Sequence, residues 1–150
     1  LVGPPNLIRE LPKIRRLIDR QGDLAMEGAI ADLIQEGVIR RYLKKALKQY
    51  RRRRDHCVDL FQKELTGYLH FNVPAGGLAL WAKFHPGVRL PELSAQLKKQ
   101  GVYLSDGLFY APEENAVRMG FGAMTEPEMV RATIILQRTI RSAFPIFARN

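Results

Sequence analysis

The spacing of hydrophobic positions along the chain changes near residue 66. Before that point, apolar residues recur at steps of three and four, which places them on one face of a helix. This pattern predicts helices over 6–20 and 24–36, followed by a long helix from about Val38 to Leu65. The expected organisation is a leading helical segment (1–37), a long helix (38–65) and a small sheet domain (66–150).

After residue 66, apolar residues alternate with polar ones in short runs, as in strands that bury one face. Glycine, proline, asparagine and aspartate bound these runs. Four segments are predicted as strands: YLHFNVP (68–74), GGLALWAKF (76–84), GVYLSD (101–106) and AVRMGFGAM (116–124).

Two further helices are predicted, over 90–100 and 126–143. Thr125 and Glu128 provide the T-x-x-E pattern of a capping box at the start of the second. Because a sheet must bury its apolar side, these helices are expected to cover one face of the strands. The predicted fold is α/β (α+β-like): N-terminal helices, then a small three- to four-stranded sheet covered on one face by helices.

The last predicted strand carries one cation among small residues. Val117, Met119 and Phe121 alternate with the other positions and are expected to face the covering helices. Arg118 then points the other way, between residues too small to shield it. A guanidinium in such an open position can hold a carboxylate through two parallel hydrogen bonds.

Composition narrows the class of protein. The chain has 150 residues, 46% of them hydrophobic, which is enough for one domain with a core. No apolar run reaches the length needed to cross a bilayer. The single cysteine, Cys57, excludes an internal disulfide, suits a reducing cytosol and is predicted to be a buried thiol. The three histidines lack metal-ligand spacing, so no metal site is predicted.

The charge raises nucleic acid as a partner. The net charge is +9, the pI is about 10.1, and much of the positive charge lies between Arg40 and Arg54. An independent basic nucleic-acid-binding domain is one hypothesis, and it predicts steeply salt-dependent binding to duplex DNA. Against it, the four arginines at 51–54 point in nearly all directions on a helix. Arg54 falls near the apolar side, where a buried pair with a carboxylate of another element is expected.

Four segments, taken in order, resemble a known family: LVGPP (1–5), YRRRRD (50–55), PAGGLALWAKF (74–84) and VRMGFGAMTEPEM (117–129). They are similar to pieces of the C-terminal part of fold-type-I, pyridoxal-phosphate-dependent aminotransferases. Those pieces are a strand end after the cofactor lysine, the Y-x-x-R-R-D part of the interdomain helix, the P-x-G-G hairpin and the R-[LIM]-[GS]-[FY] strand. More narrowly, the chain is similar to the aminotransferase-like domain of MocR-type regulators in the GntR family.

The resemblance implies roles for individual residues. Arg118 matches the arginine that binds the carboxylate of an amino acid or keto acid held as a cofactor adduct. Gly76 and Gly77 are expected to form a tight bend near the ligand, and Phe109 and Tyr110 to line the pocket.

The cofactor-binding lysine is expected upstream of Leu1, because none of the eight lysines of the chain fits its local pattern. The chain is therefore expected to be a fragment with no catalytic residue of its own. It is expected to bind no pyridoxal phosphate by itself and not to transaminate.

The resemblance implies two alternative functions. The first is the small domain of the effector region of a cytoplasmic, homodimeric transcription regulator. Such a protein would bind pyridoxal phosphate and an amino acid or amine, and would bind DNA through an N-terminal domain outside this chain. The alternative is the small domain of a stand-alone aminotransferase of the 2-aminoadipate or aromatic type. The residues upstream of Leu1 discriminate between the two.

Overall fold

The change of hydrophobic period near residue 66 marks the transition from helices to a sheet. The computed structural model describes residues 3–18, 22–109 and 113–146. The chain divides into two units, residues 1–46 and residues 47–150, and the helix α3 (Val38–Glu64) contributes to both. The predicted long helix is thus confirmed to within one residue of its expected end.

The first unit contains the helices α1 (Pro5–Ile18) and α2 (Leu24–Gln35) and the start of α3. Asp23 caps α2, because its carboxylate accepts a hydrogen bond from the Met26 backbone N–H at 3.0 Å. Gly37, with a φ of +70°, occupies the turn between α2 and α3 in a conformation that favours glycine. None of the described residues of α1 and α2 is buried, so the buried core of the chain lies in the second unit.

The second unit is built on a three-stranded antiparallel sheet of β1 (Leu69–Phe71), β2 (Ala79–Phe84) and β3 (Ala116–Gly120). The strands lie in the order β1-β2-β3, so β3 is an edge strand. The register pairs Trp81 with Arg118 and Leu80 with Met119. In antiparallel pairs, opposed residues share a face, so Arg118 lies on the same face of the sheet as Trp81.

The prediction of a strand at 101–106 is wrong. The described backbone there bonds to the helix α4 (Leu90–Lys98) and to its own turn. The Val102 N–H donates to the Leu97 carbonyl at 3.0 Å, and the Ser94 hydroxyl donates to the Leu104 carbonyl at 2.6 Å. The Val102 N–H and the Leu104 carbonyl are therefore not available for hydrogen bonds to a neighbouring strand. The outer edge of β3 has no strand partner and runs beside a loop.

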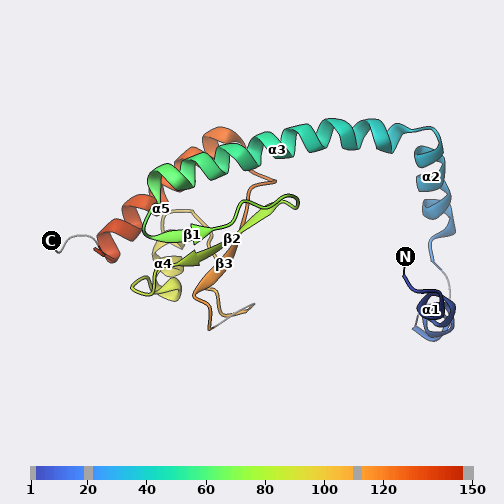
Figure 1. Ribbon diagram of the computed structural model, residues 1–150, viewed down its shortest axis with the longest axis horizontal. Helices are drawn as coiled ribbons and strands as arrows, with labels where there is room; N and C mark the ends of the chain where they lie inside the picture. Colours follow the sequence, from blue (N-terminus) through green and yellow to red (C-terminus); the bar gives the residue numbers. More distant parts are fainter. Residues whose placement is uncertain (1–2, 19–21, 110–112, 147–150) are drawn as a thin grey trace. The chain divides into compact units, whose positions relative to one another are not determined.

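One face of the sheet is buried under helices, as predicted. Leu80, Ala82, Val117 and Phe121 are each at most 2% exposed, and Met119 packs against the same core. The covering side chains come from the C-terminal half of α3, from α4 and from α5 (Glu126–Ala143). In Figure 1, α5 runs beside the C-terminal half of α3, where Glu126 and Gln137 of α5 contact α3 residues.

The capping box at the start of α5 is confirmed. The Thr125 backbone N–H and the Thr125 hydroxyl both donate to Oε2 of Glu128 at 2.7 Å. The hydrogen bond from the Thr125 side chain, followed by that from its backbone, lowers the pKa of Glu128. The first turn of α5 follows β3 after five residues, so this cap fixes the path of the chain directly after the strand that carries Arg118.

Candidate carboxylate-binding site

Arg118 lies in the middle of β3, on the face of the sheet turned away from the helices. Its residue is exposed, whereas Val117 before it is buried at 2% exposure. The neighbours of Arg118 on the same face of the strand are Ala116 and Gly120, which carry at most one methyl group. The structure therefore places the guanidinium outside the apolar core, as the alternation predicts.

The acidic group that faces this part of the sheet has other partners. Glu114 accepts from Lys83 Nζ at 2.9 Å and from Trp81 Nε1 at 3.3 Å. Hydrogen bonds from Lys83 first, and then from Trp81, lower the pKa of Glu114. Within the part of the chain that the structure describes, Arg118 makes no hydrogen bond or ion pair. Its guanidinium thus offers its donors to solvent or to a ligand.

Two arginines of α3 anchor the backbone on either side of the site. Arg53 donates to the Gly122 carbonyl, just after β3, and Arg54 donates to the Pro74 carbonyl at 3.1 Å, before β2. Arg54 also pairs with Asp55 of its own helix at 2.8 Å. The expected carboxylate partner on another element is therefore wrong, because a backbone carbonyl takes that place. These two side chains tie the loop before β2 and the segment after β3 to α3.

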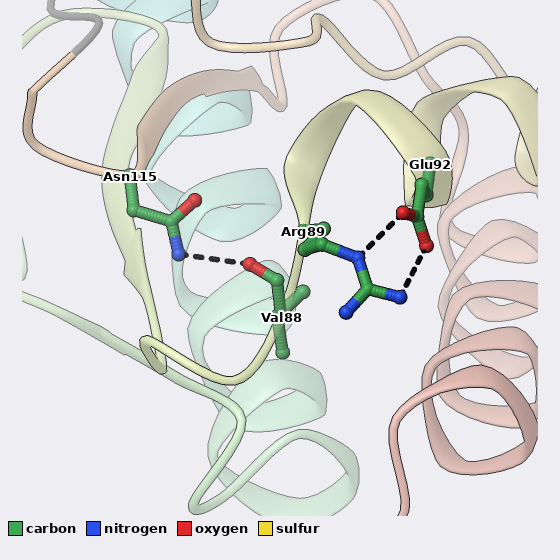
Figure 2. Close-up of polar contacts among 4 residues, drawn as sticks. All are labelled: Val88, Arg89, Glu92 and Asn115. Atoms are coloured by element: carbon green, nitrogen blue, oxygen red, sulfur yellow. Dashed lines mark hydrogen bonds and ion pairs between the residues drawn. The ribbon is translucent and has the colours of Figure 1, made fainter.

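Asn115 holds the beginning of β3, a role that the sequence patterns did not indicate. Its backbone is in the left-handed region, with a φ of +46°. Its side-chain amide donates to the carbonyls of Val88 at 3.0 Å and His85 at 3.1 Å, as Figure 2 shows for Val88. Beside this turn, the Arg89 side chain pairs with Glu92 in the first turn of α4. Asparagine tolerates this backbone conformation better than most residues, which is the one local signal for the role.

The other predicted pocket residues do not gather around Arg118. Gly77, with a φ of +84°, forms the expected bend with Gly76. Both glycines line a cavity of about 280 Å³ with Tyr50 and Arg54, and Arg118 is not part of its lining. Phe109 is 83% exposed and lines neither this cavity nor the one described next. Tyr110 lies outside the described residues.

A second, largely apolar cavity of about 220 Å³ adjoins β3. Its walls come from three consecutive residues of β3 (Arg118, Met119 and Gly120), from the loop at 102–105, from α5 and from the core residues Cys57 and Phe61. The loop at 102–105 belongs to the segment that was expected to be a strand. Burial of Cys57 in this wall raises the pKa of its thiol to about 12, in keeping with the expected inert, buried cysteine.

The lysines of the chain do not have the buried environment of a lysine that forms an imine with pyridoxal phosphate. A lysine that forms an imine with this cofactor lies in a closed pocket, where its amine is desolvated. All eight lysines belong to the described residues and all are exposed; Lys83 is ion-paired with Glu114. The described residues also hold no group of three or more histidine, cysteine or acidic side chains placed to bind a metal.

Among the described segments, no helix is both long enough and apolar enough to cross a membrane.

Several curated proteins that are similar to this chain in sequence are transcription regulators. No family model matches the chain. The probable rhizopine catabolism regulatory protein MocR of Rhizobium meliloti is 26% identical over 147 residues, which is 96% of this chain and 29% of MocR. The uncharacterized HTH-type transcriptional regulator YisV of Bacillus subtilis is 25% identical over 81% of this chain. The chain spans 25% of the length of YisV.

Several solved structures with the same fold are aminotransferases. The multiple substrate aminotransferase of Thermococcus profundus matches with a TM-score of 0.84 and 18% identity, over 92% of this chain and 35% of that enzyme. LysN, the α-aminoadipate aminotransferase of Thermus thermophilus, matches with a TM-score of 0.82 and 18% identity, over 97% of this chain and 38% of LysN. The predicted resemblance to MocR-type regulators and to the aminotransferase fold is confirmed.

Proposed function

We propose that this chain is part of the aminotransferase-like effector region of a MocR-type transcription regulator, in which Arg118 binds the carboxylate of an amino-acid ligand. The observation that carries the proposal is the state of Arg118 itself. It is an exposed cation on the face of the sheet turned away from the helices, between the buried Ala116 and the exposed Gly120, and it has no acidic partner among the described residues. A guanidinium in this state can hold a carboxylate through two parallel hydrogen bonds.

The rest of the regulator lies outside this chain in the proposal. Similarity to regulators whose names include the HTH type supports DNA binding by another part of a longer, cytoplasmic protein. Similarity to aminotransferase structures supports pyridoxal phosphate as the cofactor of that protein, bound through a lysine outside these 150 residues. The proposal also takes the longer protein to be a homodimer, as the resemblance implies.

The test uses the longer protein encoded together with the upstream sequence. Arg118→Gln should raise, by about tenfold or more, the concentration of amino acid that is needed to change DNA binding. The reason is that a charge-assisted pair contributes about 1.5–3 kcal/mol to ligand binding. Absorbance of the bound cofactor should stay unchanged. Arg138→Gln, which removes an exposed cation of α5, is the matched control. An unchanged effector response in Arg118→Gln would contradict the proposal.

A stand-alone aminotransferase remains the second candidate, favoured by the fold shared with enzymes of known structure. The upstream sequence separates the two. A DNA-binding module before the aminotransferase-like region identifies a regulator. Turnover of an amino acid with 2-oxoglutarate by the longer protein, without such a module, identifies an enzyme.

A further inference from the structure

The wall of the cavity of about 220 Å³ beside β3 is mostly apolar and includes one buried threonine of α5. Thr133 of α5 is only 3% exposed and lines this cavity. Within the described residues, its hydroxyl makes no hydrogen bond, although most buried polar side chains have a partner. The remaining wall is rich in methionine, with Met119, Met124 and Met129.

The volume of the cavity limits the size of the ligand group that it can hold. An apolar protein cavity of about 150 Å³ stays dry and binds benzene. By that comparison, a cavity of about 220 Å³ holds a group of about six to nine carbon atoms. Methionine side chains are flexible and polarisable, so a wall with three of them can adapt to different apolar shapes.

The position of Arg118 at the edge of the cavity indicates which kind of ligand would bind there. Arg118 is one of the three consecutive β3 residues that border the cavity at the open edge of the strand; its side chain lies on the outer face of the sheet and has no acidic partner among the described residues. We infer that this cavity receives the apolar tail of a carboxylic acid, while Arg118 binds the carboxylate and the Thr133 hydroxyl supplies a further hydrogen bond. The ligand class is a monocarboxylate or amino acid with an alkyl or aromatic tail of about six to nine carbon atoms. This inference rests on the proposed carboxylate-binding role of Arg118.

The methionines provide a direct readout in the 150-residue chain. The chain has four methionines, of which three line the cavity and Met26 lies in α2. In a protein with ¹³C-labelled methionine methyl groups, octanoate should shift the signals of Met119, Met124 and Met129, while the signal of Met26 serves as the internal reference. Acetate, which has no tail, should leave all four signals in place.

Variants separate this inference from the proposed function. Arg118→Gln should weaken octanoate binding about tenfold or more, and Arg138→Gln should not. Thr133→Val, which removes the hydroxyl with little change in shape, should weaken binding several-fold while leaving the melting temperature equal or higher. A higher melting temperature with unchanged affinity would leave Thr133 a structural residue and overturn its part in binding.

Two results would overturn the inference in different ways. If octanoate and acetate bind equally through Arg118 and no methionine signal moves, the proposed function stands and the cavity has no part in it. If octanoate and octanol move the three methionine signals equally and Arg118→Gln binds both normally, the cavity is a simple apolar site. In that case the carboxylate role of Arg118 fails as well.

Discussion

At the scale of single residues, the site consists of Arg118, which has no partner among the described residues, and the residues that keep its surroundings fixed. Arg118 could be placed from the alternation of β3 alone, because a strand that buries Val117 and Phe121 must turn the residue between Val117 and Met119 outward. Asn115 could not be placed in this way. Its role depends on carbonyls 27 and 30 residues earlier in the chain, which no local pattern records.

Asn115 is expected to be a stability determinant. Asn115→Gly keeps a residue that accepts the left-handed backbone but removes the amide, and Asn115→Asp replaces donors with a carboxylate that faces carbonyl oxygens. Each should lower the free energy of unfolding by about 1–3 kcal/mol, measured by urea denaturation. The exposed Asn72 provides the control, since Asn72→Asp should change the free energy of unfolding by less than about 0.5 kcal/mol. Wild-type stability in Asn115→Gly would show that the amide bonds contribute nothing.

At the scale of elements, local patterns predicted the helices and three of the four expected strands. The capping box could be predicted because Thr125 and Glu128 are three residues apart, so their interaction needs no other element. The segment 101–106 was wrongly predicted as a strand because its apolar and polar residues alternate. In the structure, its backbone groups form hydrogen bonds with Ser94 and Leu97 of α4. β3 therefore remains an edge strand, and the loop at 102–105 forms part of the wall of the cavity that β3 borders.

The capping box gives the fold a component of acid sensitivity. The pKa of Glu128 lies below its ordinary value of 4.5 in the folded state, so its contribution is present above about pH 4.5. It is lost as the pH falls through the lowered pKa, when the carboxyl is protonated in both states. Glu128→Gln should therefore be less stable than the wild type at pH 7, with the difference shrinking towards pH 3 in urea titrations. Glu113→Gln, at an exposed position, is the control; a difference that does not depend on pH would contradict this account.

At the scale of the whole molecule, the charge pattern and the fold carry different information. The net charge of +9 indicated nucleic acid as a partner, yet Arg53 and Arg54 donate to the backbone carbonyls of Gly122 and Pro74, and Arg52 pairs with Glu126 at 2.7 Å. The order of four weak motifs indicated the aminotransferase fold more specifically. That fold serves enzymes and regulators alike, so the function could not be read from it and rests on Arg118.

The most direct test of the central claim is the side-chain Nε–Hε NMR signal of Arg118, assigned by its loss in Arg118→Gln. In the 150-residue chain, acetate should shift this signal at lower concentration than it shifts those of other exposed arginines such as Arg138, and acetamide should have no effect. Acetate tests the guanidinium without involving the apolar cavity. If the signals of Arg118 and Arg138 respond to acetate at the same concentrations, Arg118 is an ordinary surface cation, and the account of this site is wrong.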